Sequence, residues 1–237
     1  MEIQDLKKVL QENGVVGAGG AGFPTYAKLD ELAEIILMNC AECEPLLKLH
    51  RQLLEQRAEE ILRTFDRIAR TVGAREAIIG IKREYKAALK AIDRYIDDYP
   101  AMRVQLLDSV YPMGDEVVLI YEATGRVIRP GGLPIEEGVA VFNVETVYNA
   151  YRALERQTPV ADKLVSVVGE VEHPLTLRVP VGAYLRDVVA YAGEITVKEP
   201  AFLVGGPMMG NLADEKAVVT RTTNAVIVLD KSHTLIQ

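Results

Sequence analysis

A glycine-rich segment near the amino terminus is the part of the sequence best suited to bind a phosphate. Five glycines fall within the nine residues 14–22, and Phe23, Pro24 and Lys28 follow them. Because glycine lacks a Cβ, its backbone can adopt positive φ and approach a ligand closely, so successive N–H groups can point at one anion. Lys28 would add a full positive charge, and Thr25 could cap a short helix whose amino end adds a partial one. The segment predicts a phosphate cradle, with Phe23 as an apolar wall beside a ring.

The same glycines match an ordinary dinucleotide-binding fingerprint only in part. Gly17, Gly19 and Gly22 have the spacing G-x-G-x-x-G. That motif normally follows a strand and opens a helix. Here residues 2–12 have the apolar spacing of a helix, and Pro24 stands where the helix of the motif should continue. On the glycines alone, a dinucleotide site and a tight turn without a ligand both stay open.

Three further polar segments each follow a predicted strand. The predicted strands are 35–38, 104–107 and 139–142, and the polar segments after them are 39–45, 111–116 and 143–146. In an open parallel sheet, the loops at the carboxyl ends of the strands meet in one crevice. The sequence therefore predicts one pocket, which suits a phosphorylated, hydrogen-bonding aromatic ligand. Its polar side chains would be Lys28, Asn39, Glu42, Glu44, Tyr111, Asp115, Glu116 and Asn143.

The remaining pattern predicts an α/β fold whose character changes at about residue 157. Helices expected at 28–34, 46–72, 84–97, 116–123 and from 143 alternate with the strands above and one at 77–81. This alternation is typical of a parallel sheet with right-handed crossovers. Beyond the change, strands at 164–169, 175–179 and 201–204, a short helix at 184–191 and a β-rich tail at 218–229 suggest a small β-grasp module. The turn 205–210 has no ionisable group, so a packing or interface role is expected.

Composition and charge exclude several classes of protein. The net charge of -7 over 237 residues argues against a nucleic-acid partner, which would require a basic face. No apolar run approaches the ~20 residues of a membrane span, and the amino terminus has no signal-peptide pattern. The only cysteines, Cys40 and Cys43, lie three apart and cannot form a disulfide framework, so a cytoplasmic location is expected.

Neither the cysteines nor the histidines suggest a metal site or a hydrolase. Cys40 and Cys43 supply two of the four ligands that a zinc site needs, and no metal site is predicted. His50, His173 and His233 are scattered along the chain, and we expect each to be an ordinary surface or packing residue. No serine or cysteine nucleophile stands beside a plausible histidine base, so hydrolysis is not expected.

Four ordered motifs resemble the flavoprotein family of the NADH-binding subunit of respiratory complex I. They are residues 17–25 followed by Lys28, residues 39–45, residues 114–116 and residues 143–146. Segments 39–47, 111–116 and 205–210 are similar to the C subunit of the Rnf electron-transport complex. They are most similar to the corrin (cobalamin) reductases of propanediol-utilising bacteria. The resemblance covers nearly the whole chain.

The resemblance implies a Rossmann-like domain over residues 1–157 that binds FMN without a covalent bond. A ubiquitin-like β-grasp (SLBB) domain would follow over residues 158–237. NADH would stack on the flavin and pass a hydride to it. The electrons would then reach an iron–sulfur domain or subunit, a corrinoid, or an Rnf-type partner.

The resemblance also assigns residues by position. The FMN phosphate and ribityl chain would be held by Gly17, Gly19, Gly20, Gly22 and Lys28. The flavin would be lined by Asn39, Glu42, Tyr111, Gly114, Asp115 and Asn143. Thr146 of the last motif is also assigned to the cofactor. The nicotinamide nucleotide would be faced by Phe23, Glu44 and Glu116. Glu116 takes the catalytic position, where it would orient the nicotinamide, since hydride transfer needs no proton relay.

Two departures from the family pattern bear on NADH geometry more than on FMN binding. Ala41 stands where the complex I subunit has an aspartate, and Asp115 stands where it has a glutamate. Relatives also continue into a cysteine-rich domain with iron–sulfur clusters. With two cysteines, this chain is not expected to hold a cluster, and it would be either a piece cut at a domain boundary or a naturally short member.

Two alternatives to an NADH-oxidising flavoprotein stay open. One is a docking or scaffold subunit that binds FMN but has little NADH activity. The other is a dinucleotide-binding protein without flavin, which would follow if the glycine segment acted alone.

Overall fold

The computed structural model describes residues 1–214 and 216–236 and divides the chain into two compact units. Unit 1 comprises residues 1–43 and 50–160, and unit 2 comprises residues 44–49 and those from 161 onward. The sequence placed a single division near residue 157 and gave no sign that 44–49 would join the later unit. Packing explains it, because Leu47 and Leu49 are buried in one apolar cluster with Leu203 and Ile227.

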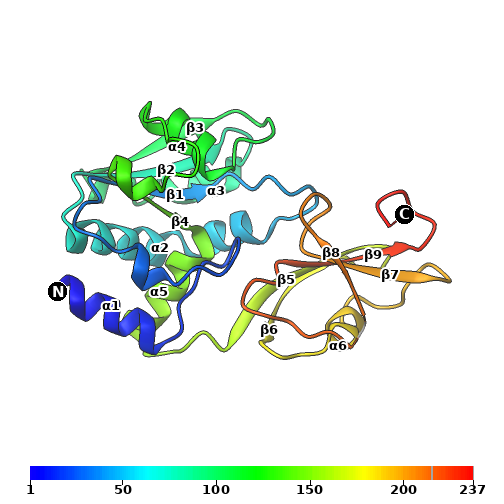
Figure 1. Cartoon of the computed structure of the whole chain (residues 1–237). Helices are drawn as coiled ribbons and strands as arrows, with labels where there is room; N and C mark the ends of the chain where they lie inside the picture. Colours follow the sequence, from blue (N-terminus) through cyan, green and yellow to red (C-terminus); the bar gives the residue numbers. More distant parts are fainter. Residues whose placement is uncertain (215, 237) are drawn as a thin grey trace. The chain divides into compact units, whose positions relative to one another are not determined.

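Unit 1 is built on a four-stranded sheet with the strand order β3-β2-β1-β4 (Figure 1). All four strands run parallel, and they are β1 (Ile35–Cys40), β2 (Glu76–Lys82), β3 (Met102–Leu107) and β4 (Val139–Asn143). Strands of a parallel sheet are covered on both faces, so β1 and β2 read as nearly continuous apolar runs. The chain passes from β1 to β2 on one side and returns to β4 on the other. The strand order therefore reverses between β1 and β4.

Helices cover both faces of this sheet. Figure 1 shows α2 and α5 on one side and α4 on the other. The α-helices of unit 1 are α1 (Ile3–Glu12), α2 (Leu49–Val72), α3 (Lys86–Ile92), α4 (Glu116–Thr124) and α5 (Val144–Arg156). Short 3-10 helices lie at η1 (Thr25–Lys28), η2 (Ile96–Asp98) and η3 (Pro134–Glu137). The core between α4 and the sheet includes Leu37, Ile78, Leu119 and Ile120. The predicted Rossmann-like arrangement is confirmed.

Unit 2 is a five-stranded mixed sheet with the order β6-β5-β9-β7-β8. Its elements are β5 (Asp162–Gly169), β6 (Leu175–Pro180), α6 (Leu185–Ala190), β7 (Pro200–Val204), β8 (Asn211–Ala213) and β9 (Ala225–Asp230). The β5–β9 pair is parallel and the other pairs are antiparallel. Leu185 and Val188 of α6 pack on Val165 and Val226 of the sheet. The predicted separate β-rich domain is confirmed.

The expected helix over residues 28–34 is wrong. The chain instead forms η1 over Thr25–Lys28 and then continues through turns to Glu34. The Asp30 carboxylate accepts a hydrogen bond from the Leu32 N–H, and such a local bond competes with a helix. Thr25 is also not a helix cap, because the cap position is Pro24 and no side-chain cap bond is present.

Several predicted boundaries shift for local reasons. The helix expected over 84–97 ends at Ile92, and η2 follows. The β-rich tail shortens to β9, because the Thr223 hydroxyl accepts from the Thr220 N–H and closes a turn before the strand begins. The three-residue strand β8 was not predicted, and it is too short to show an apolar alternation.

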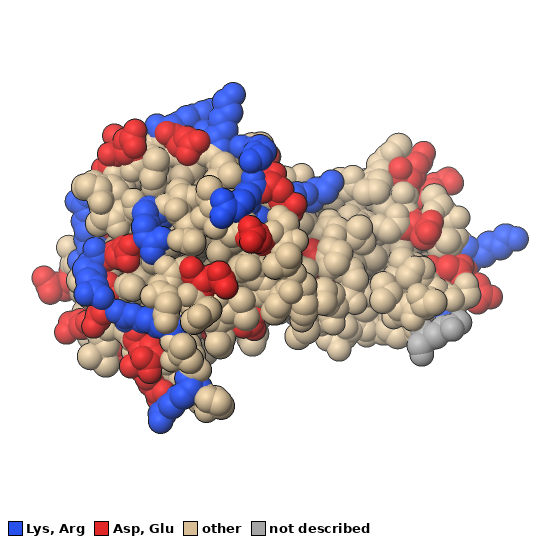
Figure 2. Space-filling view, turned by 90° about the horizontal axis from the view of Figure 1, so that it is seen from above, with Lys and Arg blue, Asp and Glu red and all other residues tan. Residues whose placement is uncertain are grey.

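The surface of unit 1 does not present one sign of charge on the face seen in Figure 2. Lysine and arginine side chains are interspersed there with aspartate and glutamate. Over residues 1–214 and 216–236, no helix combines the length and the apolar composition that crossing a bilayer requires.

Candidate functional site

A cavity of about 330 Å³ lies at the carboxyl ends of β1 and β4. This is the point where the strand order reverses, which is where open α/β sheets bind their ligands. The volume falls within the usual range of ligand pockets. The lining residues are Gly17, Gly19, Gly20, Ala21, Gly22, Phe23, Thr25, Lys28, Asn39, Gly114, Glu116, Val141, Phe142, Asn143 and Thr146.

The glycine segment forms a closed loop on one wall of this cavity. Val16 pairs with Pro24 in an isolated bridge, and the Gly17 N–H donates to the Phe23 carbonyl at 2.9 Å. The Thr146 hydroxyl of α5 accepts from the Ala18 N–H at 3.0 Å. The loop is therefore held both at its neck and at the start of α5.

Two of the loop glycines are required by geometry. Gly22 has φ of 73°, a conformation that residues with a Cβ rarely adopt. A Cβ on Gly19 would lie 2.5 Å from Asn143 Nδ2, so the loop backbone runs directly against that amide. A Cβ on Gly20 would meet no protein atom within 4 Å. The space beside Gly20 is open.

Asn39 and Asn143 are register partners on the adjacent strands β1 and β4. The Asn39 side chain accepts from the Ala41 N–H at 3.0 Å and donates to the Gly114 carbonyl at 2.9 Å. The side-chain amide oxygen of Asn143, Oδ1, caps α5 by accepting a hydrogen bond from the Glu145 N–H at 2.8 Å. Both amides are thus fixed by main-chain contacts at the floor of the cavity.

Gly114 joins the two loops that follow β1 and β3. Its N–H donates to Cys43 Sγ at 2.9 Å, and a Cβ there would overlap the Ala41 carbonyl oxygen.

Burial raises the pKa of Cys40, which keeps that thiol protonated. Within residues 1–214 and 216–236, no three histidine, cysteine, aspartate or glutamate side chains gather in a way that could hold a metal ion.

Lys28 and Glu116 form an ion pair in the cavity. Lys28 Nζ lies 3.2 Å from Glu116 Oε1 and 3.1 Å from the Val141 carbonyl oxygen. It also lies 6.0 Å from the centre of the Phe23 ring, which is half exposed. The cation, the carboxylate and the aromatic ring therefore occupy one wall.

Four residues assigned from the sequence do not line the cavity. Asp115 caps α4, with its carboxylate accepting from the Val117 and Val118 N–H groups at 3.0 and 3.2 Å. The Tyr111 side chain is mostly exposed. Glu44 belongs to unit 2, where its carboxylate accepts from the N–H groups of Met208 and Met209 at 2.9 and 2.8 Å. Glu42, the fourth, contacts a buried histidine.

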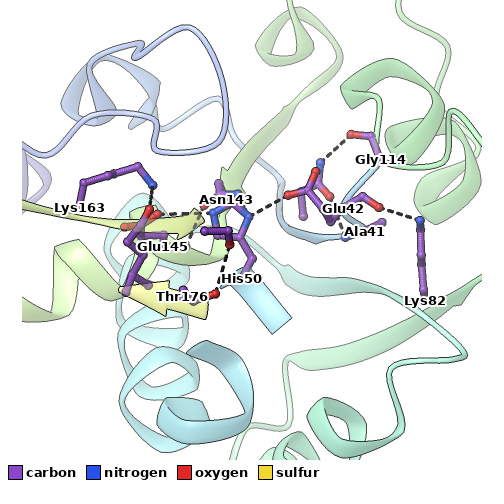
Figure 3. Close-up of polar contacts among 12 residues, drawn as sticks. Ala41, Glu42, His50, Lys82, Gly114, Asn143, Glu145, Lys163 and Thr176 are labelled. Atoms are coloured by element: carbon purple, nitrogen blue, oxygen red, sulfur yellow. Dashed lines mark hydrogen bonds and ion pairs between the residues drawn. The ribbon is translucent and has the colours of Figure 1, made fainter. Parts of the chain in front are cut away.

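That histidine, His50, was missed by sequence reasoning. The structure buries its ring beside the cavity floor, between two carboxylates (Figure 3). Nδ1 lies 3.2 Å from Glu42 Oε2, and Nε2 lies 3.5 Å from Glu145 Oε2. Nδ1 also lies 3.3 Å from Asn143 Nδ2. Burial lowers the pKa of His50, but the neighbouring carboxylates of Glu145 and Glu42 outweigh it, so the pKa lies above its ordinary value.

No local pattern could have revealed His50. It lies at the start of α2, one element beyond the loop that holds Glu42, and far in sequence from Glu145. The three groups meet only because α2 and α5 pack beside the same strand ends.

Comparison with known proteins identifies both units. Residues 10–152 match the family described as the Nuo51 FMN-binding domain, and residues 164–212 match the SLBB domain. The chain is 45% identical to the cobalamin reductase PduS of Salmonella typhimurium, over 100% of this chain and 52% of that protein. It is 30% identical to the C subunit of the Na⁺-translocating ferredoxin:NAD⁺ oxidoreductase complex of Acetobacterium woodii, over 89% of this chain and 48% of that protein.

A solved structure shows the same fold. A chain of the NAD⁺-reducing [NiFe]-hydrogenase in its air-oxidized state superposes with a TM-score of 0.77 and 27% identity. The superposition covers 98% of this chain and 47% of that one. The chain spans about half the length of the curated relatives it matches.

Proposed function

The chain belongs to the Nuo51 FMN-binding family, and we propose that it binds FMN non-covalently in unit 1 as the flavin domain of an NADH oxidoreductase. The electrons would pass on to an iron–sulfur, corrinoid or Rnf-type partner. Support comes from the relatives, which include a cobalamin reductase and one component of a ferredoxin:NAD⁺ oxidoreductase complex. The solved structure with this fold belongs to an enzyme that reduces NAD⁺.

The observation that carries the proposal is a set of hydrogen-bond donors lacking protein acceptors around one cavity. Thr25 Oγ1 is buried without a hydrogen-bond partner, and Thr25 lines the cavity. In the part of the chain that the structure describes, the N–H groups of Gly19 and Gly20 donate to no protein acceptor. Buried polar groups are normally hydrogen-bonded, so the Thr25 hydroxyl calls for a partner. Gly19 and Gly20 are exposed, so their N–H groups are accessible to a ligand rich in acceptors. Lys28 adds a positive charge to it. The residues present therefore fit FMN.

Each residue of the cavity then has a defined task. The loop from Gly17 to Gly22 and Lys28 would hold the phosphate and ribityl chain. Asn39 and Asn143, both fixed by main-chain bonds, would orient the ring system. When bound, FMN supplies the redox chemistry, namely uptake of two electrons as hydride and their release one at a time. Phe23 and Glu116 would position the nicotinamide at the open side of the cavity.

Flavin titration tests the proposal directly. The purified chain, freed of flavin, should quench FMN fluorescence with one-to-one stoichiometry. Riboflavin, which lacks the phosphate, should bind much more weakly. Equal and weak binding of both compounds would overturn the assignment of the glycine loop. Anaerobic NADH should then bleach the flavin absorbance of the loaded protein.

A second candidate is a docking subunit that holds FMN but oxidises NADH poorly. One observation favours it: position 41 is a buried alanine packed in the apolar core, so its side chain offers the ligand no polar group. FMN binding without bleaching by NADH would select this candidate. Bleaching within seconds would exclude it.

A further inference from the structure

We propose that His50 is a positioning residue of this pocket whose Nδ1 atom exchanges the Asn143 amide for the Glu42 carboxylate when the ring gains a proton. The exchange decides whether Asn143 donates its hydrogen bond to the imidazole or to the bound ligand. The inference rests on the proposed FMN site, because it assigns an acceptor on the ligand to Asn143.

The Nδ1 atom of His50 has two competing neighbours. Glu42 Oε2 lies 3.2 Å from it and Asn143 Nδ2 lies 3.3 Å from it. A carboxylate can only accept a hydrogen bond, whereas the amide nitrogen can only donate one. Nδ1 must carry a hydrogen to bond Glu42, and it must lack one to bond Asn143. The two contacts therefore exclude each other.

The orientation of the Asn143 amide is not free to relieve this conflict. Its oxygen caps α5 by accepting from the Glu145 N–H at 2.8 Å. Turning the amide over would put its nitrogen against that N–H, and the cap would be lost. Nδ2 therefore faces the ring as a donor.

The other ring nitrogen, Nε2, faces a carboxylate. Nε2 lies 3.5 Å from Glu145 Oε2, and both side chains are buried. In neutral His50 the hydrogen lies on Nε2 toward Glu145, and the Nδ1 lone pair accepts from Asn143. In protonated His50, Nε2–H still faces Glu145 while Nδ1–H donates to Glu42. Only the Asn143 bond is lost on protonation.

The donor that protonation releases, Asn143 Nδ2, belongs to a residue that lines the cavity. Nδ2 would be 2.5 Å from a Cβ on Gly19 of the cradle. A buried donor that loses its partner is unfavourable unless another acceptor takes its place. A ligand in the cavity supplies such an acceptor. Protonation of His50 and ligand binding are therefore coupled, and each favours the other.

The charged groups around the ring favour its protonated form. Glu42 faces it from the loop after β1, and Glu145 faces it from α5. Lys82 of β2 donates to the main-chain oxygen of Glu42 at 2.7 Å, and Arg51 stacks on Tyr85 at 4.8 Å. The two carboxylates raise the pKa of His50 above its ordinary 6.5 against the effect of burial.

Nuclear magnetic resonance of the flavin-free chain tests the exchange without any ligand. The ring nitrogens of His50 and the side-chain amide of Asn143 are followed from pH 5.5 to 9. We expect the neutral ring to carry its hydrogen on Nε2, and the Asn143 amide signals to titrate with the His50 midpoint. A hydrogen on Nδ1 at high pH, or Asn143 signals that ignore the His50 titration, would overturn the inference.

FMN titration of His50→Gln tests the consequence for binding. The FMN affinity of the parent divided by that of His50→Gln should rise by roughly three- to tenfold as the pH falls through the His50 midpoint. A change of this size corresponds to the free energy of one neutral hydrogen bond. The ratio cancels the titration of the FMN phosphate itself. His173→Gln, a change at an exposed histidine in unit 2, should keep the pH dependence of the parent.

The outcomes separate this inference from the proposed function. A constant affinity ratio with normal FMN binding overturns the role of His50 and leaves the flavin site intact. A parent chain that binds no FMN at any pH overturns the flavin site, and the resonance experiment still decides the exchange. If His50→Gln does not fold, the resonance experiment on the parent remains decisive.

Discussion

Lys28 Nζ lies 3.2 Å from Glu116 Oε1, so the cation assigned to the phosphate and the carboxylate assigned to the nicotinamide form one ion pair. Both side chains are partly exposed, at 30% and 43%. Exposed ion pairs contribute little to stability, because solvent screens them. The pair therefore adds little to the stability of the fold, and both side chains remain accessible from the cavity.

Replacing Lys28 should affect ligand binding and leave the fold unchanged. A charge-assisted hydrogen bond is worth about 1.5–3 kcal/mol, so Lys28→Gln should weaken FMN binding by roughly ten- to a hundredfold. Riboflavin affinity should stay the same, because riboflavin has no phosphate. Fluorescence titration with both compounds measures the difference. Equal losses for the two would place Lys28 elsewhere on the ligand.

Replacing Glu116 should affect the second ligand. Glu116→Gln removes the negative charge that pairs with Lys28. FMN should therefore bind as well as in the parent or slightly better. NADH affinity of the loaded protein should change, as measured by anaerobic titration of the flavin absorbance. Loss of FMN with unchanged NADH binding would reverse the two assignments.

The two neighbouring loop glycines should respond differently to a methyl group. Gly19→Ala pushes a Cβ against Asn143 Nδ2, which Asn143 cannot avoid without losing its cap contact. We expect a loss of about 1–3 kcal/mol of stability, as in other overpacked sites, and weaker FMN binding. Gly20→Ala should leave stability within about 0.5 kcal/mol of the parent, because its Cβ meets open space. Urea unfolding that ranks the two variants equally would contradict this.

Asp115 should matter for stability through its helix cap. Its carboxylate accepts from two N–H groups at the start of α4, so Asp115→Ala should lower the free energy of unfolding by about 1 kcal/mol. Asp115→Asn keeps an acceptor oxygen and should retain most of it. Thermal unfolding of the flavin-free chain measures both. An alanine variant as stable as the asparagine variant would show that the cap is not important.

His50 should make stability depend on pH with a defined sign. Its folded-state pKa is raised, so the protonated ring stabilises the native chain below the ordinary value of 6.5. That contribution should be lost as pH rises through the folded-state pKa. The difference in unfolding free energy between the parent and His50→Gln should therefore fall from pH 6 to pH 9. A difference that grows with pH would mean that the buried ring is neutral.

Local sequence patterns were sufficient to predict the fold class and most of the cavity wall. Local patterns carry this information, because a parallel strand is an apolar run and its loop carries the polar groups that follow. Asn39 and Asn143 were predicted from such positions, the glycine loop from its composition and Gly114 from the family resemblance, and all of them line the cavity. Propensity failed where a single side chain intervened, as at Asp30, whose carboxylate replaces a helix with a turn.

The polar groups that meet one another could be identified only from the packed structure. His50 joins Glu42 and Glu145 across two helices and a loop, and Lys28 reaches Glu116 although 88 positions separate them. Residues 44–49 leave the first unit because Leu47 and Leu49 find apolar partners in the second. Hydrogen bonds and apolar contacts depend on distances of a few ångströms between chain segments. Those distances are set by how the helices pack on the sheet, and no local pattern in the sequence encodes them.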